Sequence, residues 1–286
     1  MSRTVFVNGA FVPFEEACLP IMERGFLFAD GIYVVSAVVN GRLVDNEAHL
    51  ARFDRSLGEI RIQNPYSADE WTRLEEEIVR RNGLVEGTVY MQVTRGVAER
   101  DFAFPKDAKP TVVMFTQPKN IVNHPGAKSG VAVITMPDLR WKRRDIKSVA
   151  LLAQVLAKQA AAEAGVAEAW MIEDGFVTEG GSSTAFIVTR DGRLVTRPLS
   201  NAVLPGITRL SIMQLARETG IVIEERPFTL EEAHAAAEAF FTSASTFVMP
   251  VVTIDGGTVG DGKPGRVTQR LRELYLAMAG AAPTAA

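Results

Sequence analysis

Cysteine and histidine are scarce in this sequence, and each shortage excludes a class of chemistry. The single cysteine, Cys18, excludes an internal disulfide and a thiolate metal cluster. The three histidines, His49, His124 and His234, would all be consumed by one three-histidine metal site. We therefore expect no metal ion to take part in the function.

Long apolar runs and an excess of positive charge are also missing. No segment approaches the roughly 20 apolar residues that span a bilayer, and the first residues lack the pattern of a secretory signal. The net charge of −3 gives no electrostatic basis for coating nucleic acid or a membrane. Because 47% of the residues are hydrophobic, the chain can bury a large core. We expect a soluble, cytoplasmic enzyme or binding protein.

Local signals in the first half of the chain predict an α+β domain. Two Asn-Gly pairs, at 8–9 and 40–41, are typical of hairpin turns. Apolar residues at helical spacing predict a helix over 50–60. Ser67 and Glu70 form a capping box at the start of a second helix, which runs to about Asn82. Strands are expected at Tyr90–Thr94 and Val112–Thr116.

A polar stretch rich in turn formers, 117–130, is the best candidate for a linker. It predicts an N-terminal domain at 1–118, a linker at 119–129 and a C-terminal domain at 130–286. Beyond the linker we expect strands at 131–136, 169–173, 185–188 and 239–242, and helices at 148–164, 207–219, 231–237 and 266–279.

Four short segments could carry chemistry, although each has an ordinary structural explanation. Residues 138–147 form a solvated basic loop or a site centred on Lys147, where burial would favour a nucleophilic amine. Residues 177–186 form a simple turn or allow a backbone to approach a ligand closely. Residues 204–209 start a helix whose free N–H groups could bind phosphate. Residues 241–246 add hydroxyl groups at a strand end.

Further motifs follow one another in a fixed order. They are VNG at 7–9, RGFLFADGIY at 24–33, HLARF at 49–53, RW at 140–141, DIKS at 145–148, TEG at 178–180, LPGITR at 204–209, FTS at 241–243, MPV at 249–251 and IDG at 254–256. In this order the chain resembles the fold-type IV pyridoxal-phosphate (PLP) transaminases, and most closely the D-amino acid aminotransferases. The resemblance covers nearly the whole chain.

The resemblance implies a two-domain fold of α+β and α/β character, with a smaller N-terminal α+β domain and a larger C-terminal, PLP-binding domain built on a mixed sheet. It implies that Lys147 forms the internal aldimine with PLP and then moves a proton, both of which suit a lysine amine. Glu179 would face the pyridine nitrogen, Arg140 would lie beside Glu179, and Leu204 would pack on the ring. The phosphate would be held by Arg52, Ile207, Thr208, Ser243, Ala244 and Ser245.

For the substrate, the resemblance implies that Tyr33 and Arg100 bind the α-carboxylate and that Val35 lines the pocket. It also implies a homodimer, because the arginine loop reaches across from the second subunit. Phe102 stands where a histidine is expected, and Val34 follows Tyr33 where these enzymes usually place glutamate. Neither residue can hydrogen-bond to a substrate, so both departures predict a more apolar pocket.

The leading hypothesis is transamination between D-amino acids, such as D-alanine and D-glutamate, and 2-oxo acids. Phe102 and Val34 favour the main alternative, an (R)-selective amine transaminase, whose substrates lack a carboxylate. A branched-chain L-amino acid transaminase and an aminodeoxychorismate lyase would use the same Lys147. A protein that binds PLP without turnover is the alternative from a different class, and the joint presence of Lys147, Glu179, Tyr33 and Arg100 argues against it.

Overall fold

The computed structural model describes residues 3–281, and the chain divides into two compact units. The first unit contains Met1–Asn120 and Ile146–Ala150, and the second contains Ile121–Asp145 and Leu151–Ala286. The boundary after Asn120 falls inside the segment expected to be a linker, whereas the placement of Ile146–Ala150 differs from the expected division. The segment expected to be a linker, 119–129, contains a short helix, α4 (Pro125–Ser129), which His124 caps through its Nδ1 atom. The segment that carries Lys147 was expected in the C-terminal domain but belongs to the first unit. The end of the expected C-terminal domain, residues 282–286, lies outside the described range.

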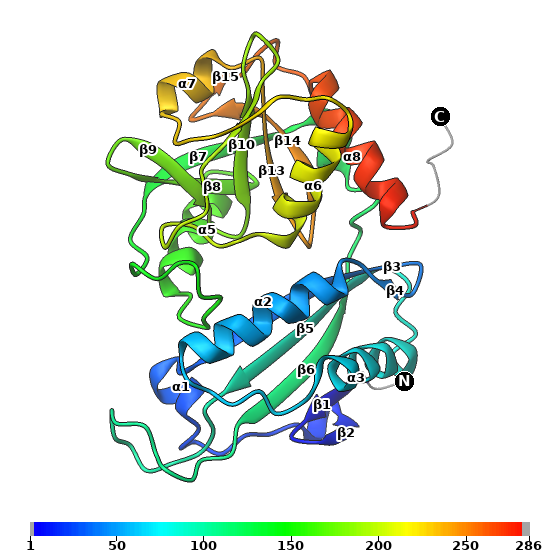
Figure 1. Ribbon diagram of the computed structural model, residues 1–286, viewed down its shortest axis with the longest axis vertical. Coiled ribbons are helices and arrows are strands. Elements are labelled where there is room, and N and C mark those ends of the chain that lie inside the picture. The colour runs from blue at the N-terminus through cyan, green and yellow to red at the C-terminus, as the bar shows by residue number, and fades with distance from the viewer. Residues whose placement is uncertain (1–2, 282–286) are drawn as a thin grey trace. The chain divides into compact units, whose positions relative to one another are not determined.

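An antiparallel sheet and two long helices form the first unit (Figure 1). The strand order is β2-β1-β6-β5-β3-β4. The strands are β1 (Thr4–Val7), β2 (Ala10–Pro13), β3 (Gly31–Val39), β4 (Arg42–Leu43), β5 (Gly87–Thr94) and β6 (Thr111–Pro118), and the helices are α1 (Arg24–Phe28), α2 (Asn46–Glu59) and α3 (Ala68–Arg81), with a 3-10 turn η1 (Phe14–Glu16). Helix α2 packs on β3, and α3 packs on β1 and β6. The expected α+β class of this unit is confirmed.

Local chemistry explains the turns and helix starts of the first unit. Both expected Asn-Gly hairpins are present, and their Asn and Gly residues all have positive φ, which this pair of residues tolerates. Ser67 accepts a hydrogen bond from the Glu70 N–H, and the Glu70 carboxylate accepts one from the Ser67 N–H. The predicted capping box is therefore confirmed.

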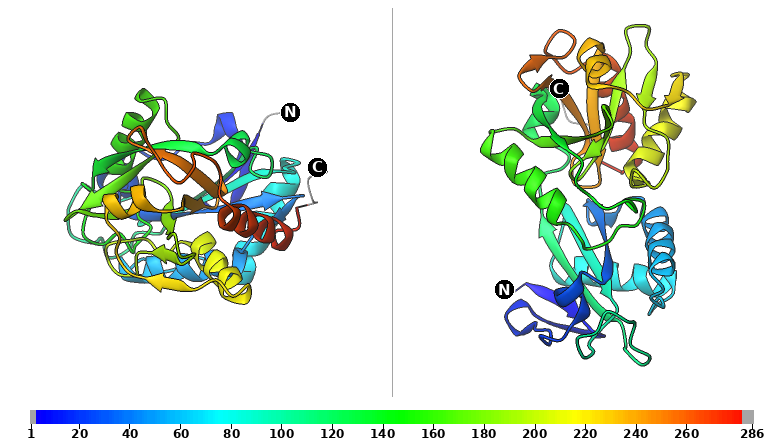
Figure 2. Two further views of the ribbon diagram at one scale, coloured as in Figure 1. Left: turned by 90° about the horizontal axis from the view of Figure 1, so that it is seen from above. Right: turned by 90° about the vertical axis from the view of Figure 1, so that its left-hand side faces the viewer.

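A mixed sheet forms the centre of the second unit, with the strand order β12-β11-β10-β13-β14-β7-β8-β9 and with β15 paired to β14. Its strands are β7 (Val131–Pro137), β8 (Glu168–Glu173), β9 (Phe176–Gly180), β10 (Thr184–Val188), β11 (Leu194–Thr196), β12 (Ile223–Glu225), β13 (Glu238–Ser243), β14 (Phe247–Ile254) and β15 (Gly257–Thr258), and its longer helices are α5 (Leu152–Glu163), α6 (Ile207–Glu218), α7 (Leu230–Ala235) and α8 (Arg266–Met278). Strand β7 is parallel to β8 and β14, whereas β13 is antiparallel to both of its neighbours, β10 and β14. Helices α6 and α8 lie side by side against β13 (Figures 1 and 2). The expected mixed sheet is confirmed.

The predicted helix over 148–164 begins later than expected, at Leu152. Residues 148–151 are not helical: the Val149 N–H donates to the Gly31 carbonyl at 3.0 Å, and Ser148 forms an antiparallel bridge with Ile32. These bonds to a strand replace the helical bonds that the apolar spacing had suggested. Pairing with distant residues therefore overrides the local helical pattern.

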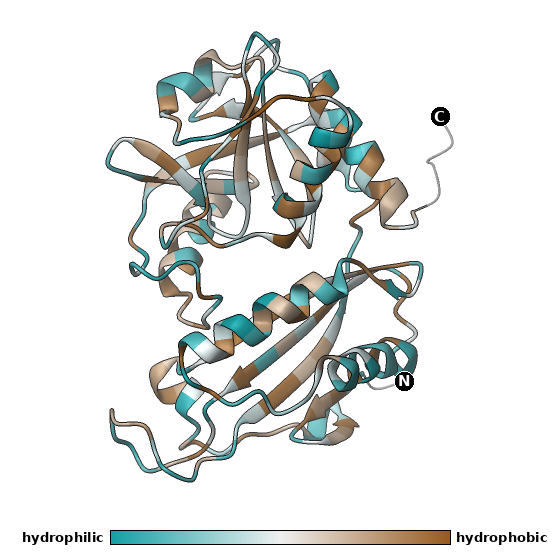
Figure 3. Cartoon of the chain, viewed as in Figure 1, coloured by the Kyte–Doolittle hydropathy of each residue, from teal (hydrophilic) through white to brown (hydrophobic). Residues whose placement is uncertain are grey.

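Apolar side chains line the strands and the inner faces of the helices in each unit. Figure 3 shows apolar residues recurring along β5 and β6, and their buried members include Val89, Met91, Val112 and Met114. In the second unit, Val133, Trp170 and Phe241 belong to one buried cluster. No helix among residues 3–281 combines the length and the apolar character needed to cross a membrane.

One carboxyl group is buried inside the first unit. Glu75 of α3 is fully buried, and neither of its oxygens has a hydrogen bond of normal geometry among the described residues. Burial raises the pKa of Glu75 to about 7, although the nearby side chains of Asn46 and Ser36 oppose the shift. Burial disfavours the charged form because a carboxylate loses hydration that these neighbours replace only in part.

Replacing Glu75 by glutamine is expected to change how stability depends on pH. The pKa of Glu75 is about 7 in the folded chain and 4.5 ordinarily, so the wild type loses stability as pH rises between these values. The loss is at most about 3 kcal/mol, at 1.36 kcal/mol per pKa unit. Urea unfolding should show that the free energy of unfolding of Glu75→Gln increases relative to that of the wild type as pH rises from about 5 to about 8. The exposed Glu47→Gln variant is the control, and parallel curves for Glu75→Gln and wild type would contradict the prediction.

Candidate functional site

The segment around Lys147 is held at the edge of the first sheet by its backbone. The Tyr33 N–H donates to the Lys147 carbonyl, and the Val149 N–H donates to the Gly31 carbonyl, both at 3.0 Å. Strand β4 pairs only with the far end of β3, at Val38 and Val39, which leaves this end of β3 available for pairing. The backbone position of Lys147 is therefore independent of its side chain.

The side chain of Lys147 lies against Tyr33. Its Nζ donates to the Tyr33 hydroxyl at 3.2 Å and lies 4.3 Å from the centre of the ring. The Tyr33 ring stacks on Tyr90, and Tyr90 stacks on Phe115, with centroid distances of 5.5 and 4.7 Å. A row of stacked rings across three strands thus fixes the hydroxyl that holds the amine. The structure brings together Lys147 and Tyr33, which are far apart in the sequence.

Helix α2 places two basic side chains in the same unit. Arg52 is buried, and His49, one turn earlier, is buried as well. Burial lowers the pKa of His49 well below its ordinary value, and the positive charges of Arg52 and Lys147 lower it further. His49 is therefore neutral near pH 7. His49 belongs to the HLARF motif, but nothing in the sequence indicated that its side chain is buried and uncharged.

Val34 lies on the opposite face of β3 from Tyr33 and Val35. It is 1% exposed and belongs to the buried core with Ile32 and Phe53, whereas Tyr33 and Val35 are half-buried. Alternate residues of a strand point to opposite faces, which explains the difference. The expectation that Val34 makes the edge of the pocket more apolar is therefore wrong. Val34 contributes to the core beneath the sheet.

Arg100 and Phe102 lie in the loop that follows β5, and both are exposed. The guanidinium carbon of Arg100 lies 5.3 Å from the Phe28 ring centre and 5.6 Å from that of Phe102. The two rings are 5.4 Å apart. These distances are within the range of cation–π attraction. The Phe102 ring therefore contacts the Arg100 guanidinium. The sequence resemblance, which showed only that Phe102 replaces a histidine, did not predict this contact.

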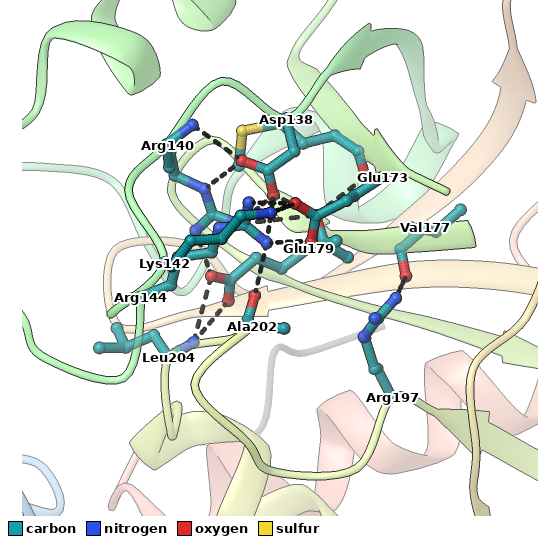
Figure 4. Close-up of polar contacts among 12 residues, drawn as sticks. Asp138, Arg140, Lys142, Arg144, Glu173, Val177, Glu179, Arg197, Ala202 and Leu204 are labelled. Carbon is teal, nitrogen blue, oxygen red and sulfur yellow. Dashed lines mark hydrogen bonds and ion pairs between the residues drawn. The ribbon is translucent and has the colours of Figure 1, made fainter. Parts of the chain in front are cut away.

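In the second unit, Glu179 is the centre of a buried polar network (Figure 4). Its carboxylate forms an ion pair with Arg140 and accepts the Leu204 N–H through both oxygens, at 3.1 and 3.3 Å. Asp138 holds Arg140 from the other side, with bonds of 3.0 Å to Nε and 2.7 Å to Nη2. Thr178 donates to Asp138 at 2.6 Å. The predicted pairing of Arg140 with Glu179 is present, and Asp138 is a further member that the sequence did not single out.

Burial and charge act in opposite directions within this network. Burial raises the pKa of Glu179, while Arg140 and the Leu204 amide lower it in part. Burial also tends to raise the pKa of Asp138. Arg140, Thr178 and Arg144 outweigh this effect and hold that pKa below its ordinary value. The pKa of Arg140 is raised by its two carboxylate partners despite burial. Arg140 thus stays charged and anchors a fully enclosed glutamate.

The start of α6 presents backbone N–H groups without a side-chain cap. Gly206 is the N-cap residue, and no side chain among the described residues caps this helix start. The helix spans Ile207–Glu218, so the N–H groups of Ile207 and Thr208 lie in its first turn. A Cβ atom at Gly206 would lie 2.7 Å from the Thr184 hydroxyl, which explains the glycine. This helix end can bind an anion.

The turn between β13 and β14 gathers hydroxyl groups. The Ser243 hydroxyl lies 2.7 Å from that of Thr246 and 3.3 Å from that of Ser245, while Ala244 offers only its backbone. Arg272 of α8 donates to the carbonyls of Thr246 and Val248 at 2.9 and 2.7 Å. Sequence reasoning included Thr246 in the hydroxyl-bearing segment 241–246 without naming it as a phosphate ligand, and it missed Arg272. An arginine within an amphipathic helix gives no sign of such a contact.

Comparison with known proteins agrees with this arrangement. The family model of amino-transferase class IV matches residues 31–254. The chain is 39% identical over 272 residues to the D-alanine aminotransferase of Staphylococcus aureus (strain MSSA476), covering 95% of this chain and 96% of that one. It is 39% identical over 270 residues to the D-alanine aminotransferase of Bacillus licheniformis, covering 94% of each.

A solved structure extends the comparison to the fold. The branched-chain aminotransferase of the thermophilic archaeon Thermoproteus uzoniensis, solved with norvaline, has a TM-score of 0.85 and 28% sequence identity. The match covers 99% of this chain and 97% of that one. Because the family model spans most of the sequence and these relatives align over nearly their whole length, the chain belongs to the class IV aminotransferases.

Proposed function

We propose that this protein is a PLP-dependent aminotransferase that moves an amino group between D-amino acids, of the D-alanine and D-glutamate type, and 2-oxo acids. The observation that carries the proposal is the 39% identity to a D-alanine aminotransferase over 95% of this chain. The local geometry supports it, since Lys147 lies within hydrogen-bond distance of Tyr33. Both residues belong to the motifs that the D-amino acid enzymes share.

The side chains of each unit fit PLP. Lys147 supplies a primary amine for the aldehyde, and buried Glu179 supplies a carboxylate for the pyridine nitrogen. The uncapped N–H groups of α6, the hydroxyl-rich turn at Ser243–Thr246 and the buried Arg52 are suited to a phosphate dianion. Leu204 donates its N–H to Glu179, and we propose that its side chain contacts the ring. When bound, PLP supplies an electron sink for the carbanion at the substrate Cα.

Side chains of the protein would transfer the proton of the substrate Cα and stabilise the positive charge on the ring nitrogen. Lys147 Nζ would accept the proton from the substrate Cα and deliver it to the C4′ carbon of the cofactor, and the Tyr33 hydroxyl would hold that amine in position. Glu179 would favour the protonated form of the ring nitrogen of bound PLP, because a nearby carboxylate stabilises a positive charge. Arg140 and the Leu204 amide fix the orientation of Glu179.

Substrate recognition rests on the carboxylate. A guanidinium fork matches a carboxylate, so Arg100 is proposed to bind it together with the Tyr33 hydroxyl. Val35 shares the strand face of Tyr33 and lines the side-chain pocket. We propose a cytoplasmic homodimer in which Arg100 of each subunit serves the substrate of the other, in keeping with its exposed position.

A second candidate, an (R)-selective amine transaminase, is favoured by one observation. Phe102 is 77% exposed beside Arg100 and cannot donate a hydrogen bond to a carboxylate. Val34 no longer favours this candidate, because it is buried in the core. The two functions therefore differ in whether Arg100 meets a carboxylate.

The half-reaction without oxo acid separates these functions. Purified holoenzyme is mixed in separate experiments with D-alanine, L-alanine, L-leucine and (R)-1-phenylethylamine, and loss of its visible absorption band is followed. We expect D-alanine to bleach the band at least about tenfold faster than the other three, since only it offers a carboxylate in the matching configuration.

Each other result has a definite meaning. Faster bleaching by the aryl amine would replace the proposal with the amine transaminase. Faster bleaching by either L-amino acid would contradict the stereochemical assignment. A protein without a visible band after incubation with PLP would contradict the cofactor assignment itself.

A further inference from the structure

Arg24 is a buried cation that no step of the proposed mechanism uses. It lies at the start of α1 with 3% of its side chain exposed, and its Nε donates to Asp30 at 2.8 Å. Its Nη1 donates to the carbonyl of Asp101 at 2.6 Å, and its Nη2 lies 3.5 Å from that of Phe102. Asp101 and Phe102 are the two residues that follow Arg100. Arg24 therefore holds the backbone of the Arg100 loop from inside the unit.

Asp30 joins Arg24 to a second arginine at the base of the same loop. Arg95, just after β5, donates to both Asp30 oxygens, at 2.7 and 3.0 Å, and is also buried. Its other donors reach the carbonyls of residues 60 and 61 after α2, at 2.7 and 2.9 Å. Its guanidinium carbon lies 3.5 Å from the ring centre of Phe104. Through its two arginine partners, the half-buried carboxylate of Asp30 thus links the start of the loop at Arg95 to the loop backbone at Asp101 and Phe102.

Phe28 connects this network to Arg100 itself. The guanidinium carbon of Arg24 lies 4.7 Å from the Phe28 ring centre, and that of Arg100 lies 5.3 Å from the same centre. Phe102 packs on Phe28 at 5.4 Å. One ring therefore contacts a buried arginine and an exposed one. Hydrogen bonds fix the loop backbone, and the rings restrict the side chain of Arg100.

We propose that Arg24 is a positioning residue for substrate recognition, acting through Asp101, Phe102 and Phe28 to preorganise Arg100. The inference rests on the proposed function, in which Arg100 binds the substrate carboxylate. Arg24 is too deeply buried to meet the substrate itself. A guanidinium held in place before binding loses less rotational freedom when it meets a carboxylate, so its loss weakens binding. The effect appears in KM for D-amino acids and leaves kcat nearly unchanged.

The test is a double-mutant cycle with Arg24→Gln, Arg100→Gln and the double variant, assayed with D-alanine. We expect Arg100→Gln to raise KM about tenfold or more, and Arg24→Gln to raise it severalfold, with kcat within about twofold. Because Arg24 acts through Arg100, adding Arg24→Gln to Arg100→Gln should change KM no further. Arg24→Lys should restore part of the loss, since a lysine can still pair with Asp30.

Controls distinguish positioning from general damage. Phe28→Leu keeps every charge but removes the shared ring, so it should raise KM in the same way even if Arg24→Gln folds poorly. Arg193→Gln removes an exposed arginine that pairs with Asp191 and Glu224, and should leave KM unchanged. The inference would be overturned if the increase in KM of the double variant equalled the product of the two single increases. A fall in kcat of Arg24→Gln without a change in KM would also overturn it. If Arg100→Gln alone leaves KM unchanged, the proposed role of Arg100 fails as well.

Discussion

Replacing Lys147 by alanine is expected to abolish transamination while leaving the fold intact. In the proposed mechanism this side chain supplies both the amine that binds the cofactor and the base that moves the proton, and no other amine is seen to contact Tyr33 among the described residues. Turnover should therefore fall by about 10⁴-fold or more. The backbone bonds between this segment and β3 do not involve the side chain, so the unfolding temperature should change little. Rapid-quench measurement of pyruvate formed from D-alanine checks the prediction.

Lys142→Ala is a matched control from the same loop. Lys142 is 83% exposed at its side chain and pairs with Glu173, which Arg144 also holds. We expect this variant to keep nearly wild-type turnover, because an exposed ion pair contributes little. A Lys147→Ala protein that still formed pyruvate at a rate near that of Lys142→Ala would refute the proposed mechanism.

Replacing Glu179 by glutamine is expected to lower kcat by about two orders of magnitude, the usual effect of losing one preorganised electrostatic contact. The amide keeps the shape of the side chain and can still accept the Leu204 N–H. It carries no charge, however, and cannot favour a protonated ring nitrogen. Steady-state kinetics should show the fall in kcat. Titration with PLP should show that the variant still binds the cofactor when the PLP concentration is raised.

Two further variants show whether the charge itself matters. Glu179→Asp keeps the carboxylate and should recover part of the lost rate. Glu173→Gln removes a neighbouring carboxylate that pairs with Arg144 and does not contact Arg140. It should therefore leave kcat within about twofold of the wild type. Equal losses in Glu173→Gln and Glu179→Gln would mean that the network acts only structurally.

Features that depend on nearby residues could be predicted from the sequence. The Asn-Gly turns and the Ser67 capping box depend on hydrogen bonds and φ angles within a few residues. The last helix, expected over 266–279, is observed at Arg266–Met278, because its apolar spacing and its burial against β14 agree. The resemblance also paired Arg140 with Glu179 correctly, since this ion pair is part of the shared motif pattern.

Features that depend on residues distant in the sequence could be decided only by the tertiary structure. The segment at 147–151 carries a helical pattern but is not helical, because its backbone bonds to the end of β3 instead. Val34 follows Tyr33 directly but points into the core, because the sheet buries alternate residues. Arg24 reads as an ordinary charged residue, and its role depends on Asp101 and Phe102, more than seventy positions away. The sequence by itself thus determined the local elements and the type of chemistry. Tertiary packing decided which side chains meet, because burial and long-range hydrogen bonds exist only in the folded chain.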